Sequence, residues 1–203
     1  MHDKEPCRFW ANAFNLHPEV RGMHGIKSTL ATVTEDMVAT LNGRRTVEYT
    51  LGGDFGGGVF VVGYSDNHDL IQPAMQFLKM GDGPYYTFYR PYHLVHIEAP
   101  CSIAEVHLDR EPTIIPAGPF VTDVVAIAKK DLERGDVLDG IGGWTTYGEV
   151  DIAENAAGFL PVGLTEHAQI VKPVTMDEPI PLDAIELDEE IPIVKARLEQ
   201  DAL

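Results

Sequence analysis

The feature that most constrains the fold is a change of sequence texture between residues 112 and 119. Pro112, Pro116, Gly118 and Pro119 lie within this short stretch, and such a density of proline and glycine is typical of a linker. Before it, helical periodicity alternates with strand-like segments. After it, short β-rich pieces alternate with turns. The sequence therefore predicts an α+β domain over about residues 1–115 and a small all-β module over about residues 119–187, with an acidic tail and a short helix over 188–203.

The elements expected within these parts follow from apolar spacing and residue type. Helices are predicted over 4–16, over a segment capped by Asp66 and ended by Gly81, and over 93–108 with a break or kink at Pro100. Strands are predicted over 45–51, 59–64, 85–90, 121–128, 137–138, 159–162 and 169–171, and a last helix over 193–203.

A glycine-rich run, Gly52-Gly53-Asp54-Phe55-Gly56-Gly57-Gly58, lies between two of the expected strands. It does not match the pattern G-x-G-x-x-G, because Asp54 and Val59 stand where the nearest registers need glycine. No βαβ unit is arranged around it either, so the sequence offers no Rossmann domain. We favour a flexible hairpin connection for this run, and a loop that covers a substrate is the alternative.

The net charge of the chain limits the classes of partner that we expect it to bind. The formal net charge is −17 at pH 7, and 21 of the 32 acidic residues follow Cys101. Phosphate backbones and anionic lipid surfaces repel such a chain, so neither nucleic acid nor a membrane is an expected partner. A small anionic substrate is more plausible in the less acidic N-terminal half. We interpret the acidic half that follows Cys101 as a solvated surface.

The location expected for the chain is the cytoplasm. Its longest apolar runs fall far short of the roughly 20 residues that cross a membrane. The first five residues do not have the pattern of a secretory signal. The two cysteines, Cys7 and Cys101, are far apart in the sequence, which fits a reducing compartment better than a disulfide scaffold.

The segment 78–93 is the densest in chemical groups. Arg90 can clamp a carboxylate or phosphate with two hydrogen bonds, and Lys79 can add a point charge. Asp82, between two glycines, can orient a hydroxyl or a metal-bound water. His93 is the expected proton donor or acceptor. Asp82 and His93 are therefore the catalytic candidates, and Lys79 and Arg90 are substrate-binding candidates.

Further substrate-binding candidates are Tyr86 and Tyr92, whose apolar rings carry a hydroxyl donor, although an aromatic core strand explains these tyrosines equally well. Arg21 and His24 are also candidates, because glycines beside them expose their side chains. His93 and His96 share a helix face with Glu98 nearby. No third ligand appears at an informative spacing, so a metal site is not expected from this pair.

Several motifs, in order, make the chain resemble the second half of the SAF-domain-containing, homoserine-dehydrogenase-like NAD(P)-dependent oxidoreductases. These motifs cover nearly the whole chain, and their occurrence in this order makes the resemblance specific. The motifs are Trp10–Ala13, Val20–Gly25, Leu78–Tyr86, Tyr89–Leu94, Val125–Gly143, Leu160–Leu164 and Glu186–Glu189.

The resemblance implies that different domains bind the nucleotide and the substrate. In that family an N-terminal Rossmann domain binds NAD(P)H, a central α+β domain holds the substrate, and a small β-clip SAF module follows. Some relatives are similar in activity to deoxyxylulose-phosphate reductoisomerase, which makes a divalent metal possible. The nucleotide-binding half is absent from these 203 residues. The chain is thus expected to be inactive alone and to work with a missing Rossmann half or a homo-oligomer partner.

Two other hypotheses remain. The chain can be a non-catalytic SAF-type module that binds a ligand or assists assembly, in which case Arg90 is structural. Alternatively, an exposed apolar face of the helix at residues 4–16 drives self-association.

Overall fold

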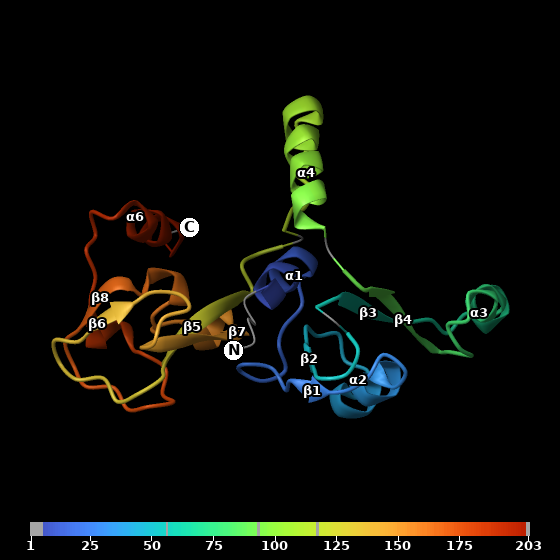
Figure 1. The fold of residues 1–203 in the computed structure, drawn as a ribbon, viewed down its shortest axis with the longest axis horizontal. Helices are drawn as coiled ribbons and strands as arrows, with labels where there is room; N and C mark the ends of the chain where they lie inside the picture. Colours follow the sequence, from blue (N-terminus) through green and yellow to red (C-terminus); the bar gives the residue numbers. More distant parts are fainter. Residues whose placement is uncertain (1–5, 56, 93, 117, 202–203) are drawn as a thin grey trace. The chain divides into compact units, whose positions relative to one another are not determined.

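The structure, a computed structural model, describes residues 6–55, 57–92, 94–116 and 118–201 (Figure 1). Its contacts group the chain into two compact units. Unit 1 comprises residues 1–24, 46–48 and 116–203, and unit 2 comprises residues 25–45 and 49–115. Both helices and small sheets are present, consistent with the α+β class expected from the sequence.

Unit 1 is built around β5 (Thr122–Ala128), whose seven residues are all buried. It pairs antiparallel with β7 (Thr146–Ile152) along its whole length. A second antiparallel sheet holds β6 (Val137–Asp139), β8 (Glu166–Ile170) and β9 (Ile185–Glu186). Short helices and 3-10 turns connect these strands: α5 (Ala153–Ala156), η1 (Val162–Leu164) and η2 (Leu182–Ala184), followed by α6 (Pro192–Asp201).

The N-terminal helix α1 (Pro6–Phe14) packs against β5 within unit 1. Asn12 makes the junction: its Oδ1 accepts hydrogen bonds from the backbone N–H groups of Val121 (2.8 Å) and Thr122 (3.2 Å), and its Nδ2 donates to the Thr122 carbonyl (3.0 Å). The sequence placed this helix in a domain ending at residue 115. The contacts group it instead with the β-rich module, because these hydrogen bonds join positions more than 100 residues apart.

A buried carboxylate reinforces the same junction. The side chain of Asp123 is 4 % exposed and lies 3.6 Å from Nη1 of Arg8 on α1 and 2.5 Å from Nη1 of Arg197 on α6. Burial alone would lower the pKa of Arg197, but hydrogen bonds to Asp201 and Asp123 outweigh it and raise that pKa. The Arg197 guanidinium therefore stays charged and holds α6 to β5, while Arg8 holds α1 to the same carboxylate.

Helix α1 leaves part of its apolar surface uncovered. Ala11 and Ala13 are buried, whereas Phe9, Trp10 and Phe14 remain substantially exposed. The rings of Trp10 and Phe14 stack with their centroids 6.0 Å apart. Self-association through this helix stays a prediction.

Unit 2 contains two small two-stranded sheets. In the first, β1 (Ile26–Lys27) pairs in parallel with β2 (Thr50–Leu51). In the second, β3 (Val59–Tyr64) pairs antiparallel with β4 (Tyr85–Arg90), and α3 (His68–Phe77) connects them. Helix α2 (Val33–Leu41) supplies the core side chains Val33, Met37 and Leu41, which pack with Ile26, Phe55, Phe60, Val62 and Tyr89. Helix α4 (Val95–Asp109) has no buried residue.

The glycine-rich run corrects an expectation. It was predicted as a hairpin connection, but β2 and β3 belong to different sheets, so that interpretation is wrong. Phe55 at its centre is buried in the core, and its carbonyl accepts a 2.5 Å hydrogen bond from the Tyr89 hydroxyl. Asp54 accepts from the backbone N–H of Leu30 at 2.8 Å. The glycines let the loop take positive φ, as at Gly53 (69°), where a Cβ would meet the Ser28 carbonyl at 2.5 Å.

Other elements differ in extent from the sequence expectation. The strand predicted over 45–51 is reduced to Thr50–Leu51, and α4 runs unbroken through Pro100. Helix α3 is capped by Asn67, whose side chain accepts from the Leu70 N–H, and not by Asp66. Helix α2 and strand β7 were not predicted, and the strand expected over 159–162 is wrong, because that segment forms only isolated bridges at Phe159 and Pro161 before η1.

We expect Asn12→Ala to lower the free energy of unfolding of unit 1 by about 2 kcal/mol, because it leaves two half-buried backbone N–H groups and a carbonyl without their partner. Urea titration followed by circular dichroism measures this. The matched control is Asn155→Ala, since Asn155 makes a single long hydrogen bond (3.3 Å) to Asp151. An equal loss in both variants would show that Asn12 has no special role.

Candidate functional site

The residues predicted to form one substrate site lie at two ends of the β3–β4 hairpin. Lys79 and Asp82 follow α3, before β4 begins. Arg90 is the last residue of β4, and Tyr92 follows it. Since a strand rises about 3.3 Å per residue, the six residues of β4 alone separate the two groups by about 17 Å. Within one copy of the chain, Lys79 and Arg90 therefore cannot clamp the same small anion.

Arg90 is the exposed guanidinium of the predicted set. Its Nε donates to the Tyr92 carbonyl (3.3 Å), and its Nη2 donates to Glu98 on α4. The side chain is 65 % exposed. A guanidinium has five N–H donors, so three remain for an oxyanion beside the Glu98 contact.

The other predicted residues of the hairpin have structural partners or are exposed. Tyr86 is 3 % exposed and packs under the turn at Gly83, so it is a core residue rather than an open donor. Asp82 accepts from Gln76 Nε2 at 2.8 Å, which holds the turn to α3. Lys79 is exposed with φ of 59°. His93, the predicted proton carrier, lies outside the described residues.

A second cluster surrounds His24 in unit 1. The Nδ1 atom of His24 lies 2.9 Å from Oε2 of Glu48, and the same oxygen accepts the His24 backbone N–H at 2.9 Å. Nε2 of the ring lies 3.8 Å from Oε2 of Glu19. The Glu48 side chain is 5 % exposed, so its charge is held where it orients the imidazole. A histidine fixed in this way presents Nε2 as the atom that takes up or releases a proton.

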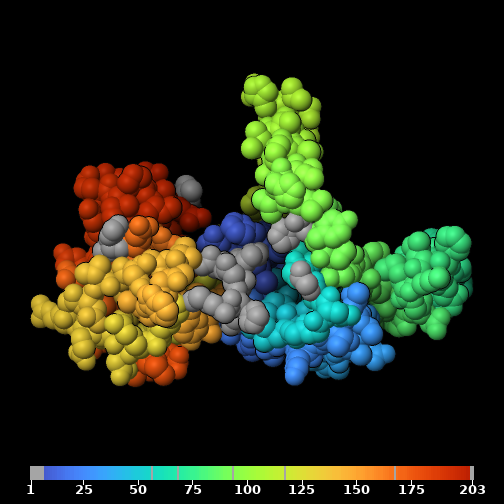
Figure 2. Space-filling model, viewed as in Figure 1, coloured from blue at the N-terminus to red at the C-terminus, as the bar shows by residue number. Residues whose placement is uncertain are grey.

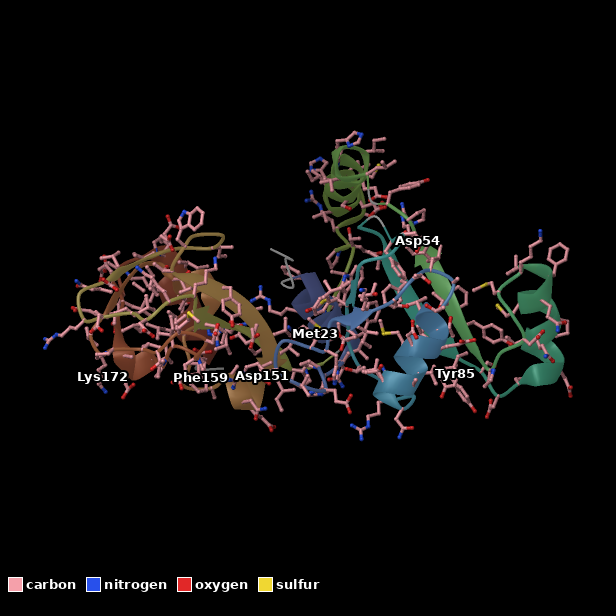
Figure 3. All side chains as sticks on the ribbon, turned by 60° about the horizontal axis from the view of Figure 1, so that its bottom comes forward. Met23, Asp54, Tyr85, Asp151, Phe159 and Lys172 are labelled. Atoms are coloured by element: carbon pink, nitrogen blue, oxygen red, sulfur yellow. The ribbon has the colours of Figure 1, made fainter. Side chains whose placement is uncertain are left out.

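Arg21, predicted to bind substrate, is instead engaged within unit 1. Its Nε lies 2.6 Å from Oδ2 of the buried Asp151 on β7. Its guanidinium carbon lies 5.3 Å from the ring centroid of Phe159. Figure 3 labels Asp151 and Phe159, both of which contact Arg21. These contacts fix the turn that carries His24 against β7.

Sequence reasoning missed a loop that Asp139 organises. The carboxylate of Asp139 accepts hydrogen bonds from the hydroxyl and the backbone N–H of Thr145 and from the backbone N–H of Trp144 (2.5 Å). These bonds, first the Thr145 hydroxyl and then the Trp144 N–H, lower the pKa of Asp139 from 3.8 to about 2. Trp144 is presented 88 % exposed. The signal in the sequence was Asp139 followed by Gly140, Gly142 and Gly143.

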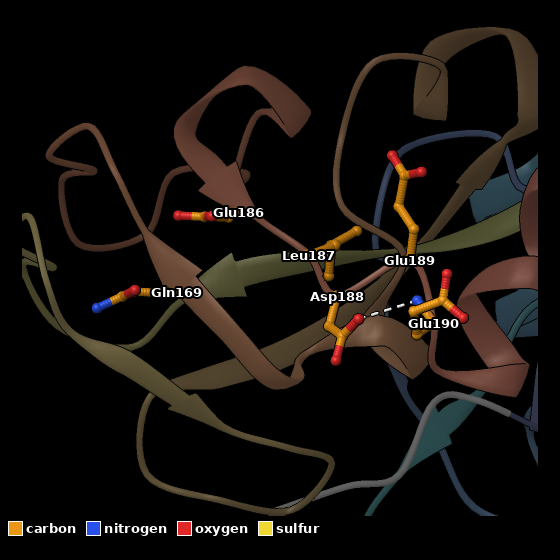
Figure 4. Close-up of a pocket in the computed structure, with 6 residues that line it drawn as sticks. All are labelled: Gln169, Glu186, Leu187, Asp188, Glu189 and Glu190. Carbon is orange, nitrogen blue, oxygen red and sulfur yellow. Dashed lines mark hydrogen bonds between the residues drawn. The ribbon is translucent and has the colours of Figure 1, made fainter.

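Two of the hollows in the described part of the chain lie on unit 1. The larger, of about 460 Å³, is lined by four carboxylate side chains with Gln169 and Leu187 (Figure 4): Glu186, Asp188, Glu189 and Glu190. Such a lining repels an anionic substrate. The smaller, of about 250 Å³, lies beside Asp139, Gly140 and Ile141. Neither contains a residue predicted to bind substrate.

The described residues do not fit the cofactors that the resemblance implies. No group of three or more His, Cys, Asp or Glu side chains among them could hold a metal ion. The glycine-rich run leads from a two-residue strand into β3 and not into a helix, so it lacks the helix N-terminus that cradles a pyrophosphate.

Among the described helices, none is long and apolar enough to cross a membrane.

Comparison with known proteins gives one family. Residues 7–99 match the family model described as "Oxidoreductase DRL, catalytic domain". The match spans α1, the His24 turn, the hairpin and Arg90, and it covers just under half of the chain. It supports assignment to an oxidoreductase family. No curated protein matches the chain significantly.

We expect the His24 ring to carry its proton on Nδ1 when neutral, because Glu48 accepts there. In Glu48→Gln the amide can also donate, so the preference for that tautomer falls. Two-dimensional NMR of the ring nitrogens measures the tautomer directly. His107, on the exposed helix α4, is the internal control. A wild-type ring protonated on Nε2 would contradict the arrangement.

The Asp139 loop gives a pH dependence with a defined sign. The folded pKa of about 2 is below the ordinary 3.8, so the ionised carboxylate stabilises the fold above about pH 4. That stabilisation is lost as the pH falls toward 2. Between pH 5 and 2.5, wild type should therefore lose more stability than Asp139→Asn. Urea unfolding at several pH values measures this, with Glu154→Gln as the exposed control. Parallel curves for wild type and Asp139→Asn would refute it.

Proposed function

We propose that this chain supplies the substrate-binding portion of an NAD(P)-dependent oxidoreductase that acts on a small anionic hydroxy or oxo compound. The observation that carries the proposal is the match of residues 7–99 to an oxidoreductase catalytic domain. The nucleotide is bound by a part of the enzyme outside these 203 residues, since the described residues offer no dinucleotide cradle. The β-rich part of unit 1 acts as a SAF-type module attached to this portion.

Arg90 is the anion anchor in this proposal. It is exposed, lies within the matched residues and keeps donors beside its pair with Glu98. A guanidinium binds carboxylate and phosphate through two parallel hydrogen bonds, which suits the proposed substrate class. Glu98 competes with the substrate for the same guanidinium, so it tunes the affinity.

His24 is a candidate for proton transfer in the same enzyme. Reduction of an oxo group requires a proton for the product oxygen, and the reverse oxidation requires a base. Glu48 orients His24 for either role. Asp82 and His93, the candidates chosen from sequence, remain predictions.

The test is ligand binding to the chain alone. We expect no NADPH binding by fluorescence at micromolar concentrations. Titration calorimetry with inorganic phosphate and with a short hydroxy acid should detect an anion site. Arg90→Ala should abolish this binding, whereas Glu98→Gln should strengthen it several-fold by freeing the guanidinium.

Stability separates a binding role from a structural one. The exposed Arg90–Glu98 pair contributes about 0–1 kcal/mol, so the melting temperature should barely change in either variant. A drop of several degrees in Arg90→Ala would mark Arg90 as structural. Tight NADPH binding by the chain alone would contradict the proposal that another part of the enzyme binds the nucleotide. So would absence of turnover on hydroxy acids, oxo acids and sugar phosphates once a nucleotide-binding half is supplied.

A further inference from the structure

The turn that precedes His24 is bound to β7 at two successive residues. Nε of Arg21 lies 2.6 Å from Oδ2 of Asp151, whose side chain is 4 % exposed. The backbone N–H of Gly22 donates to the Val150 carbonyl at 2.8 Å. Gly22 has a φ of 74°, a backbone conformation that favours glycine. The turn therefore takes its position from a strand that lies 130 residues further along the chain.

Asp151 is itself fixed, so it is a defined anchor for Arg21. Its Oδ1 accepts the backbone N–H of Ile152 at 2.8 Å and Nδ2 of Asn155 at 3.3 Å, which leaves Oδ2 to face Arg21. The guanidinium carbon of Arg21 also lies 5.3 Å from the ring centroid of Phe159. Removing one partner of such a pair leaves a buried charge uncompensated, which is costly. Arg21 is therefore held in place by both its charge and its planar face.

The ring of His24 depends on the position of this turn. One oxygen of Glu48 accepts the His24 backbone N–H and also lies beside Nδ1, both at 2.9 Å. A shift of the turn therefore lengthens both contacts at once. The Glu48 segment is anchored separately, since Oγ1 of Thr46 donates to the His17 carbonyl at 2.6 Å. Met23 is buried with a φ of 61°, which a residue other than glycine keeps only where its surroundings enforce it.

These contacts cross the boundary of the family match. Residues 7–99, which match the oxidoreductase catalytic domain, supply His24 and Glu48. Asp151 and Phe159 lie outside the match, in the β-rich part of unit 1. In the space-filling view the dark blue atoms of α1 lie beside the yellow and orange atoms of that part (Figure 2). The β-rich part thus contacts the matched segment directly within one unit.

We propose that Arg21 and Asp151 are positioning residues for His24, through which the β-rich part of unit 1 sets the geometry of the imidazole. β7 holds the turn, the turn places the His24 backbone N–H on Glu48, and the same Glu48 oxygen fixes Nδ1. The consequence for catalysis rests on the proposed role of His24 in proton transfer. The position of the ring does not depend on that role.

A second ion pair on the same sheet separates positioning from general stabilisation. Arg197 lies 2.5 Å from Asp123, which is also 4 % exposed, and its guanidinium carbon lies 5.6 Å from the centroid of an aromatic ring. Asp123 and Asp151 are directly paired across β5 and β7. The two pairs therefore match in chemistry and burial. They differ in location, because Arg197 is on α6 and Arg21 is on the turn that carries His24.

The test is NMR of the His24 ring nitrogens in the 203-residue chain. Arg21→Gln/Asp151→Asn removes both charges of the pair, so no buried charge is left uncompensated. It should replace the Nδ1-protonated form by a mixture of the two tautomers. The matched control, Arg197→Gln/Asp123→Asn, should keep the wild-type tautomer although its melting temperature falls by a similar amount.

A milder variant decides the result if the double variant does not fold. Arg21→Lys keeps the charge beside Asp151 but loses the planar guanidinium, so it should change the His24 signals in the same direction by a smaller amount. Unchanged ring signals in the Arg21 variants would overturn the proposal. An equal change in the control would also overturn it, because any weakening of the sheet would then move the ring.

Kinetics distinguish this proposal from the proposed function. In the enzyme completed with a nucleotide-binding half, Arg21→Gln/Asp151→Asn should lower kcat at least about tenfold, because the proton carrier is misplaced. KM should barely change, since Arg90 is unaltered. A rise in KM alone would mark Arg21 as a substrate-binding residue and overturn the positioning role. Altered ring signals with an unchanged kcat would support the positioning of the ring and overturn proton transfer by His24.

Discussion

The burial of β5 is the constraint on which unit 1 depends. All seven of its residues are buried, so each neighbour must satisfy its backbone or its side chains. β7 pairs with one edge, bridges to Pro161 and Pro179 add further backbone partners, and α1 returns from the far end of the sequence to bond its first residues through Asn12. The charged residue of β5, Asp123, is tolerated because Arg8 and Arg197 compensate its charge. These requirements explain why the N-terminal helix belongs to the C-terminal module in space.

The sequence predicted best the elements whose residue pattern is decisive on its own. The strands Val59–Tyr64 and Tyr85–Arg90 match their expected limits, because β-branched and aromatic residues are bounded there by Gly58 and Pro91. Long-range partners decide the rest. The segment 45–51 has strand-like residues, yet only Thr50 and Leu51 pair as a strand, with β1, while Thr46 forms an isolated bridge to His17. The run at residues 52–58 looked like a flexible connection because its glycines are visible in the sequence, while the burial of Phe55 in the core of unit 2 is not.

The prediction of the candidate site from sequence was limited in the same way, because long-range contacts are not visible in the sequence. Closeness in sequence grouped Lys79, Asp82 and Arg90, but an extended strand carries its ends apart, and β4 separates these charges. The sequence did indicate that Arg21 and His24 were exceptional, since glycines surround them. It could not indicate that Asp151 and Phe159 hold Arg21 while Glu48 orients His24, because those partners come from distant segments. Arg90 remains the predicted residue whose exposure and free donors suit a substrate anion.

The two units differ in net charge and in how completely their apolar surfaces are covered. Unit 1 holds most of the negative charge, its central strand is buried, and Arg8, Arg21 and Arg197 pair with internal carboxylates. Unit 2 carries a smaller excess of negative charge, has a small core around Phe55, and leaves α4, Val61 and Phe88 exposed. Arg90 lies at the junction of that hairpin with α4 and is paired with Glu98 on the helix. The position of α4 therefore sets the position of Glu98, and with it the number of guanidinium donors left for an anion.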